Sequence, residues 1–513
     1  MKKGLLTIAG MLLTVSLVSA GTTVPVLADE ETTLVYGSGD YTRINPAMDE
    51  HGEINILIFN GLTAHDGDNQ VVPGLAESWD FDDETNTYTF HMAEDAKWQD
   101  GEPVTAEDVK FTIEAIMDPE NGSENAPNYE DVEEINVVDD HTVAFKLEDK
   151  NVAFLDYMTM AVLPKHLLEG EDMQTSDFFR NPVGTGPYKI ESWDEGQAIT
   201  LVKNEDYFKG EPSIDKIVFK IVPDDNAKAL QLKSGELDLA LLTPKDAASF
   251  AGDDAYTCYD MKTADYRGIM FNFGNEYWQK NRDLIPAVCY GLDRQAIIDA
   301  VILGQGMPAY GPLQRNVYNC EDVEHYDYNP EKAKELLKEA NWDPNTELDV
   351  VYYYTDQMTQ DLMAIIQQYL AEVGIKMNAR LVEGDLATIL WKAPEDPVNG
   401  PSAVDWDMCY AANAALSLHE YYDRYQTGYS INSHTPSDPK LDELIAATNA
   451  SVDAEVQRKA FFELQKYENE TLFELPLYYQ PIFLLQSDKI VKGAKLGNPQ
   501  FNYNWDIQNW EIK

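Results

Sequence analysis

Apolar and polar residues alternate along short stretches of this chain, and stretches with helical spacing separate them. Residues 87–92 and 141–147 show the period of two that predicts half-buried β-strands. Between them, we expect a helix that begins at Thr105, with Asp108 reaching back to cap it. Apolar residues recur at helical spacing between positions 109 and 116, which indicates one buried face.

A Gly-rich turn opens the stretch from residue 181 to residue 240. Gly184 and Gly186 permit positive φ or a close approach of two backbones, and Pro187 fixes φ at a strand entrance. Alternating apolar residues then predict strands near positions 188, 199 and 217, and a helix follows. This order builds part of a sheet with a crossover.

The second half of the chain shows the same alternation of strands and helices. An apolar strand is expected at residues 266–273, and Asp293 and Asn329 precede helical stretches as N-caps. Strand, helix, strand and strand patterns follow between residues 347 and 412, and an extended run through Pro476 comes after a further helix. The pattern predicts a second α/β lobe.

The first residues have the pattern of an export signal. Two lysines precede an apolar run of about 14 residues that ends at Val18, and cleavage is expected after Ala20 or Ala28. The run is short for a membrane span, although an N-terminal anchor is the alternative. We therefore expect a signal peptide over residues 1–28 and an exported mature chain, periplasmic or at the extracellular face of the cell envelope.

Acidic residues far outnumber basic ones. The 513 residues include 90 Asp and Glu against 38 Lys and Arg, which gives a formal charge of −52. Such a charge repels nucleic acid and anionic membranes, and it either favours cationic solutes or simply keeps the protein soluble. An apolar fraction of 44% supplies enough core for two or three domains.

Motifs of common enzymes and metal sites are absent or incomplete. No nucleophile elbow, phosphate-binding loop or dinucleotide fingerprint occurs, and Asp423 replaces the second His of a zinc motif that would begin at His419. A calcium loop beginning at Asp66 fails, because Val71 occupies the position that needs Gly. We expect a turn at residues 66–69, no metal, no cofactor and no catalytic residue, with a secreted hydrolase as the remote alternative.

Four cysteines remain after export: Cys258, Cys289, Cys320 and Cys409. An oxidising destination permits disulfides, but the spacing does not decide among the three full pairings. We expect these cysteines to be structural, either paired or present as buried thiols.

A strand is also expected at residues 34–36, and it ends in a polar turn. Ligands of open α/β sheets gather at the carboxyl ends of strands. Ser38, Gly39 and Tyr41 are therefore candidate ligand contacts, and an ordinary loop is the alternative.

Two long blocks of the sequence resemble one family. Residues 181–240, with GTGPY, VKNEDYFKGEPSIDKIVFKIVPD and SGELDLA, and residues 72–119, with VPGLAESW and WQDGEPVTAEDV, are similar to the family 5 solute-binding proteins of ABC importers, which bind peptides or nickel. The resemblance covers nearly the whole mature chain. It implies an α/β fold of the type II periplasmic-binding class, with two lobes, a hinge and an additional inserted domain. Many relatives carry a lipid on a cysteine at the cleavage site, but the first cysteine here is Cys258.

The resemblance also implies the domain order. The expected parts are the signal peptide at 1–28, the first lobe at 29–61, 183–265 and 481–513, the inserted domain at 62–182, and the second lobe at 266–480. The chain would therefore cross twice between the lobes, which close on a solute.

In peptide-binding relatives, an aromatic residue is followed three positions later by an Asp that pairs with the peptide's amino group. The corresponding residues here are Tyr410 and Asn413. An amide carries no charge to offset a desolvated ammonium, so a neutral or modified solute becomes an alternative to a free-amine peptide. If the alignment slips, Asp407 or Glu420 is the acid that would take over.

Further ligand contacts are expected near strand ends of the second lobe, at Tyr266, Asn272, Trp391 and Tyr422. His419 joins them because nickel-binding relatives use a His in this lobe, although no second His or Cys stands nearby at ligand spacing.

The expected function is the solute-binding component of an ABC importer, with an oligopeptide as the leading ligand. The protein is expected to act as a monomer, to meet membrane permease subunits and to bind no nucleic acid. The alternatives are binding of a sugar, a cation or a nickel complex, and service to a surface sensor without transport.

Overall fold

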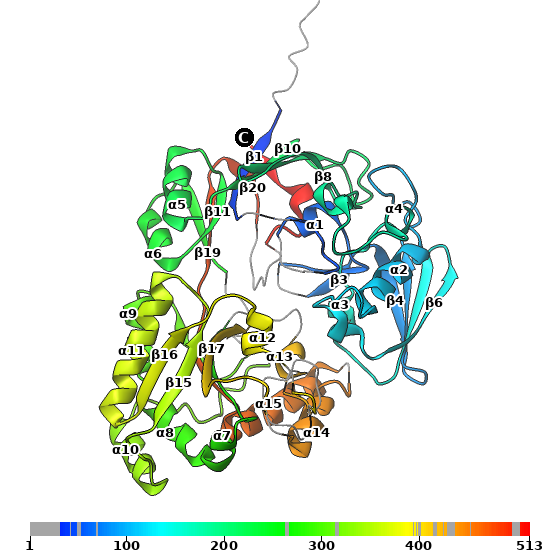
Figure 1. Ribbon diagram of the computed structural model, residues 1–513. Helices are drawn as coiled ribbons and strands as arrows, with labels where there is room; N and C mark the ends of the chain where they lie inside the picture. The colour runs from blue at the N-terminus through cyan, green and yellow to red at the C-terminus, as the bar shows by residue number, and fades with distance from the viewer. Residues whose placement is uncertain are drawn as a thin grey trace, which may run out of the picture. The chain divides into compact units, whose positions relative to one another are not determined.

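The computed structural model (Figure 1) describes the chain from residue 31 onward, with gaps. The described residues are 31–39, 41, 43–48, 53–67, 70–261, 266–312, 318–392, 394–396, 398, 402–413, 418–423, 425–427, 437–451, 453–494 and 503–513, with the backbone alone at Glu276, Ala387, Asn413, Glu420 and Asp423. The predicted signal peptide and its cleavage positions lie outside them. Met1–Glu31 and Thr32–Lys513 form separate units, and all elements below belong to the second unit.

The largest sheet has seven strands in the order β12, β19, β11, β1, β10, β9, β8. Its strands are β1 (Thr33–Ser38), β8 (Tyr188–Asp194), β9 (Ala198–Lys203), β10 (Lys216–Ile221), β11 (Leu239–Leu242), β12 (Tyr256–Asp260) and β19 (Phe483–Ser487). β1 runs parallel to both β10 and β11, and the outer pairs are antiparallel. Helices α5 (Asp225–Ser234) and α6 (Pro244–Ala247) pack on β11. The three strands predicted after the Gly-rich turn are confirmed.

A separate antiparallel sheet has the strand order β4, β5, β7, β6. Its strands are β4 (Ala76–Asp82), β5 (Thr87–Met92), β6 (Val132–Asp139) and β7 (Thr142–Leu147). Helix α2 (Ala106–Met117) packs against β6 and β7. Its predicted cap is confirmed, because the backbone N–H of Thr105 donates to Asp108 Oδ2 at 2.8 Å.

Short elements surround this sheet in the sequence: α1 (Asn55–Ile58), β2 (Thr63–His65), β3 (Val71–Pro73), α3 (Phe154–Tyr157) and α4 (Lys165–Leu168). β2 and β3 form a hairpin, and Asp66 Oδ1 accepts a hydrogen bond from the backbone N–H of Gln70 at 2.9 Å. Residues 68 and 69 of the predicted turn lie outside the described part of the chain.

The third main sheet has six strands in the order β14, β18, β13, β17, β15, β16. They are β13 (Tyr266–Phe271), β14 (Met307–Pro308), β15 (Glu347–Tyr352), β16 (Lys376–Leu381), β17 (Met408–Asn413) and β18 (Glu474–Tyr479). The associated helices are α7 (Glu276–Lys280), α8 (Ile285–Tyr290), α9 (Arg294–Val301), α10 (Pro330–Glu339), α11 (Gln357–Val373), α12 (Leu386–Leu390), α13 (Glu420–Asp423), α14 (Pro439–Thr448) and α15 (Ala454–Thr471). The predicted caps of α9 and α10 are confirmed, since Asp293 accepts from Ala296 N and Asn329 from Lys332 N. Within the described chain, no helix is long and apolar enough to span a bilayer.

The chain passes twice between the seven-stranded and the six-stranded sheet. It leaves after β12 to begin β13, and it returns from β18 to β19. The backbone N–H of Met261 donates to the carbonyl of Ile482 at 2.9 Å, so the two connections lie side by side. Near its end the chain forms the antiparallel pair of β20 (Ile490–Lys492) and β21 (Glu511–Ile512). The predicted α/β class is confirmed, and the residue boundaries of the domains stay a prediction.

Gln99 joins the two sequence blocks that carry the family resemblance. Its side-chain oxygen accepts from the backbone N–H of Gly184 at 3.1 Å, and its side-chain nitrogen donates to the carbonyl of Tyr188 at 2.7 Å. The backbone N–H of Gly186 donates to the carbonyl of Ile58 at 2.7 Å. A Cβ at Gly184 would lie 1.8 Å from the Ile58 carbonyl oxygen, so this position requires glycine.

We expect Gly184→Ala to destabilise the protein, because the added methyl group would overlap a backbone oxygen that has little freedom to move. Overpacking of this kind lowers the free energy of unfolding by about 1–3 kcal/mol or more. Urea denaturation of the mature chain measures the change. Gly39→Ala is the control, since a Cβ there meets nothing within 4 Å. Equal midpoints for the two variants would contradict the prediction.

Candidate functional site

The strand ends of the six-stranded sheet that lie next to the two connections are rich in tyrosine. We call this side of the sheet, formed by the ends of the strands, the tyrosine-rich edge. β13 begins there with Tyr266, which pairs with Asn413 at the end of β17 and with Tyr479 at the end of β18. β15 runs parallel to β17, so its carboxyl end, followed by Tyr353 and Tyr354, belongs to the same edge. The strand register therefore brings together two of the predicted ligand contacts, Tyr266 and Asn413.

Hydroxyl groups and one guanidinium group occupy this edge. The hydroxyl oxygens of Tyr353 and Tyr354 are 2.9 Å apart, and those of Tyr410 and Tyr478 are 3.0 Å apart. The guanidinium carbon of Arg267 lies 4.5 Å from the centre of the Tyr354 ring. Burial raises the pKa of Tyr410, so its hydroxyl stays neutral and keeps its proton for hydrogen bonding. The edge can stack against a solute and bind its polar groups.

A buried carboxylate that sequence analysis missed supports this edge. Glu474 in β18 is 1% exposed, and its Oε2 accepts hydrogen bonds from the hydroxyls of Tyr266, at 2.9 Å, and of Tyr425. A Cβ at position 268 would lie 2.3 Å from Glu474 Oε1, so the glycine there leaves room for the carboxylate. The one signal in the sequence is a single acid within the apolar run TLFELPLYY.

The side chain of Asn413 is not described, so its role as a replacement for an amine-binding Asp stays a prediction. Its backbone pairs with Tyr266 and places the residue at the tyrosine-rich edge. Asp407 precedes the first residue of β17 and lies at the opposite end of that strand. Asp407, one of the two acids that could replace the amine-binding Asp, is therefore separated from residue 413 by the length of β17. The side chain of the other acid, Glu420, lies outside the described part of the chain.

The predicted contact Asn272 follows the last residue of β13, so it lies at the opposite end of this strand from Tyr266. It is fully buried, and its Nδ2 donates to the carbonyl of Trp406 at 2.9 Å. Sequence analysis predicted that Tyr266 and Asn272 lie near strand ends. In the structure, Tyr266 begins β13 and Asn272 follows its last residue. The structure therefore does not bring Asn272 together with the tyrosines.

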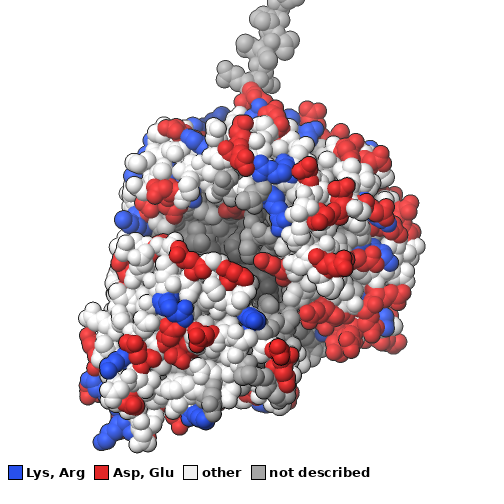
Figure 2. Space-filling model, viewed as in Figure 1, with Lys and Arg blue, Asp and Glu red and all other residues white. Residues whose placement is uncertain are grey.

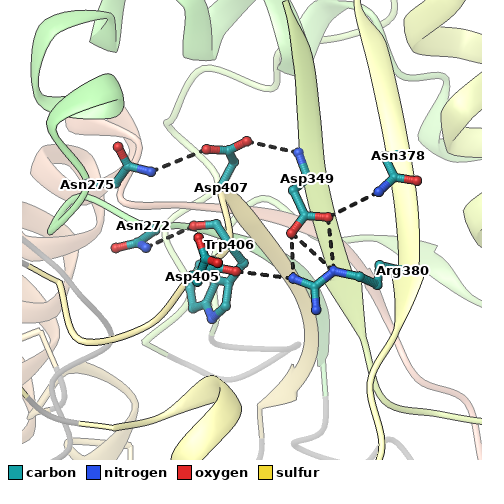
Figure 3. A network of polar contacts seen from close by, with 8 residues as sticks. All are labelled: Asn272, Asn275, Asp349, Asn378, Arg380, Asp405, Trp406 and Asp407. Atoms are coloured by element: carbon teal, nitrogen blue, oxygen red, sulfur yellow. Dashed lines mark hydrogen bonds and ion pairs between the residues drawn. The ribbon is translucent and has the colours of Figure 1, made fainter.

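A polar network holds the strands together at that opposite end. Asp349 Oδ1 and Oδ2 each lie 3.2 Å from Arg380 Nε, and the backbone N–H of Asp349 donates to Asp407 Oδ2 at 2.9 Å (Figure 3). Asn275 Nδ2 donates to the other oxygen of Asp407 at 3.3 Å. Burial, and then the charges of Asp349 and Asp405, raise the pKa of Asp407. These contacts tie β15, β16 and the start of β17 to the residues after β13.

In the seven-stranded sheet, Ser38 ends β1 and is buried, while Tyr41 is half-buried. The Tyr41 hydroxyl donates to Glu53 Oε2 at 2.8 Å. The carbonyl of Ser38 accepts from the backbone N–H of Val222, one residue past the end of the parallel strand β10. Both predicted contacts thus lie at the carboxyl ends of parallel strands, where ligands of α/β sheets gather.

The remaining predicted contacts lie in apolar surroundings. His419 is 7% exposed, its Nδ1 lies 3.1 Å from Thr448 Oγ1, and its ring packs on Phe461. Tyr422 is buried beside Phe461, and its hydroxyl has no hydrogen-bond partner in the described structure. Trp391 is half-buried against the cluster that contains Trp406. Their roles in ligand binding stay predictions.

All four cysteines are free thiols. Cys289, Cys320 and Cys409 are buried thiols, as expected. The expectation is wrong for Cys258, which is neither paired nor buried, because it lies at an exposed position of β12 at the end of the seven-stranded sheet. Burial raises the pKa of the Cys289 thiol to about 12. Among described residues, no group of three or more His, Cys, Asp or Glu side chains is arranged to hold a metal ion.

Acidic side chains spread over the face shown in Figure 2, and Lys and Arg are fewer and scattered among them. This distribution agrees with the net charge of −52. Several of the basic residues form exposed ion pairs, for example Lys146 with Glu133 and Lys466 with Asp322. Exposed pairs of this kind contribute at most about 1 kcal/mol each, so the surface charge matters more for solubility than for stability.

Comparisons with known proteins agree along nearly the whole chain. The family model described as bacterial extracellular solute-binding proteins, family 5 middle, matches residues 70–438. Protein XP55 of Streptomyces lividans is 29% identical over 456 residues, 85% of this chain and 81% of that protein. The oligopeptide-binding protein AppA of Bacillus subtilis is 29% identical over 509 residues, 93% of this chain and 91% of that protein. The crystal structure of NikZ from Campylobacter jejuni in complex with Ni(L-His) aligns with a TM-score of 0.80 at 26% identity, covering 94% of this chain and 99% of that one.

Glu474→Ala is expected to weaken the fold around the tyrosine-rich edge, because the hydroxyls of Tyr266 and Tyr425 lose a charged acceptor inside the protein. A hydrogen bond to a charged group contributes about 1.5–3 kcal/mol, so we expect the free energy of unfolding to fall by at least about 2 kcal/mol. Glu474→Gln should lose less, because its amide oxygen still accepts. Glu463→Ala, at an exposed position of α15, is the control for urea denaturation; a Glu474→Ala variant as stable as this control would disprove the role.

We expect the stability of the protein to depend on pH through His419. Burial lowers the pKa of His419 from 6.5 to about 4, so the unfolded chain binds this proton more readily than the folded one. The contribution to stability is therefore complete above pH 6.5 and is lost as the pH falls towards 4, by up to about 3 kcal/mol. Between pH 7 and pH 4.5, the wild type should lose about 2–3 kcal/mol more than His419→Asn in urea denaturation. Parallel losses would show that His419 is not the titrating group.

Proposed function

Because the chain belongs to the bacterial extracellular solute-binding proteins of family 5, we propose that it captures an oligopeptide outside the cytoplasm and delivers it to the permease of an ABC importer. The observation that carries this proposal is the family match over residues 70–438. AppA, which aligns over 93% of this chain, is named as an oligopeptide-binding protein. The mature protein acts as an exported monomer, and it releases its solute unchanged because it is not an enzyme.

The two adjacent connections between the sheets are the hinge in this proposal. They are joined by the hydrogen bond from Met261 to Ile482, so a rotation about them moves residues 266–480 as one body. The tyrosine-rich edge of the six-stranded sheet begins directly after one connection and ends directly before the other. The carboxyl edge of β1 and β10 supplies the contacts of the other lobe. A solute held between them is buried when the lobes close.

A neutral solute, such as a sugar, is the second candidate. The identity of residue 413 favours it, because the asparagine stands where peptide-binding relatives carry a charged partner for the ammonium group. An amide can bind a hydroxyl or a carbonyl group without a charge on the solute.

A thermal-shift screen of the mature protein, refolded without ligand, separates these candidates. The panel contains di- to hexapeptides, their N-acetylated forms, sugars, polyamines and Ni(II) with histidine. A bound solute at 100 times its Kd adds about 2.7 kcal/mol to the free energy of unfolding, so the correct class raises the midpoint clearly. We expect peptides to do so, with one peptide bound per chain in calorimetry and no cleavage product in mass spectrometry.

A raised midpoint with sugars and none with peptides would disprove the oligopeptide proposal and leave the solute-binding function in place. Product formation from any member of the panel would disprove the non-enzymatic role.

A further inference from the structure

A carboxylate bound by two tyrosine hydroxyls lies beside β1 of the seven-stranded sheet. Glu53 Oε1 accepts a hydrogen bond from the Tyr36 hydroxyl at 3.0 Å, and its Oε2 accepts one from the Tyr41 hydroxyl at 2.8 Å. Among the described residues these two hydroxyls are the partners of the Glu53 side chain, and no Lys, Arg or His joins them. Within the described part of the chain, the negative charge is thus shared with two neutral donors.

Such a charge is unfavourable where the surroundings exclude water. Tyr36 is buried, and Tyr41 and Glu53 are half-buried, so the carboxylate is only partly hydrated. Hydroxyl donors offset part of the desolvation of a carboxylate, but a full opposite charge offsets more. A positive charge beside this carboxylate would therefore offset desolvation that the two hydroxyls leave uncompensated.

Two further side-chain oxygen atoms lie close to this carboxylate, on Tyr503 and Asn504. Asn504 Oδ1 belongs to a side chain that is 3% exposed, and it has no hydrogen-bond partner in the described structure. The Tyr503 side chain is 2% exposed, and its hydroxyl interacts with the Tyr36 hydroxyl. Asn504 Nδ2 donates to the backbone carbonyl of Glu53 at 3.1 Å, and the rings of Tyr503 and Tyr36 are 6.2 Å apart. A buried amide oxygen normally has a partner, and a donor group is what Asn504 Oδ1 lacks.

The cluster lies at the sheet edge that binds ligands in this fold class. Tyr36 belongs to β1, which ends two residues later at Ser38, and Tyr41 follows in the next turn. β1 and β10 are parallel and end together, with Ser38 paired to Ile221. Ligands of open α/β sheets bind outside such carboxyl ends.

From this arrangement we infer that Glu53, with Tyr36, Tyr41, Tyr503 and Asn504, forms a subsite for an ammonium group of the solute. The inference rests on the proposed solute-binding function. An ammonium group has three N–H donors, and the carboxylate, the Tyr503 oxygen and Asn504 Oδ1 are acceptors for them. The first lobe thereby supplies the negative charge that is absent at residue 413 of the second lobe. The ammonium group belongs to a peptide's amino terminus or to an amine side chain.

The test is calorimetric titration of the mature wild type, Glu53→Gln and Glu102→Gln. Glu102 is exposed, and its substitution changes the net charge equally, so it is the matched control. The probes are trialanine, N-acetyl-trialanine, N-acetyl-Ala-Lys-Ala and putrescine. Glu53→Gln should bind the amine-bearing probes about 10- to 100-fold more weakly than the wild type, as expected for loss of a charged hydrogen-bond partner. Any binding of N-acetyl-trialanine, which has no ammonium group, should be unchanged.

Each possible result supports or overturns the ammonium subsite. Loss of trialanine binding alone assigns the subsite to the amino terminus, and loss of N-acetyl-Ala-Lys-Ala binding assigns it to a side chain. If the wild type binds putrescine but no peptide, and Glu53→Gln loses putrescine binding, the result supports the subsite and disproves the oligopeptide proposal. Equal affinities of Glu53→Gln and the wild type, or a wild type that binds none of the amine probes, overturn the inference.

Unfolding of Glu53→Gln would be recognised from its melting curve without ligand. In that case Glu53→Asp replaces it, because this variant keeps the carboxylate and shortens its reach by one methylene group. The expected result is a folded protein with weaker binding of the amine probes and unchanged binding of N-acetyl-trialanine. A folded Glu53→Asp variant with wild-type affinity for those probes overturns the inference.

Discussion

The pairing of β19 with both β11 and β12 is the constraint on which the rest of the architecture depends. β12 joins the seven-stranded sheet through β19, and β19 is reached only after the chain has passed through residues 266–480. Because both connections meet the sheet at neighbouring strands, they must run side by side, as the hydrogen bond from Met261 to Ile482 shows. The sheet order thus produces two adjacent connections, and these are what a hinge between two lobes requires.

Local patterns were sufficient to predict most elements of the fold. Alternation of apolar residues predicted β5, β8, β9 and β10, and short polar side chains predicted the starts of α2, α9 and α10, because each of these signals acts over a few residues. The position of β19 was not predictable in this way, since the sequence of a strand does not identify its neighbours. The same limit explains why Asn272 was wrongly grouped with the tyrosines. Periodicity locates the two ends of β13, but only the antiparallel pairing with β17 shows which end faces the candidate site.

Sequence analysis could name individual residues of the candidate site but not which residues lie next to them. Tyr266 and Asn413 were named separately from the sequence, and the register of β13 with β17 makes them neighbours. Glu474 and Glu53 were missed, because an acid in an apolar run or in a turn gives no indication of what surrounds it. Both carboxylates are bound by tyrosine hydroxyls, one pair in each lobe. Tyrosine suits this task, since its ring packs in an apolar environment while its hydroxyl donates to the charge.

The place of β19 also governs the order in which the protein can be completed. As the chain is synthesised from its amino terminus, β12 has no neighbour until residues 483–487 have been added, more than 200 residues later. Until then the first sheet has an open edge at β11, and the apolar residues that β19 will cover, such as Leu242, remain accessible. A nascent chain therefore cannot form its final sheet before synthesis is nearly finished. Under the export proposed for this protein, the delay is an advantage, because the sequence order of the strands keeps the sheet incomplete while the chain crosses the membrane.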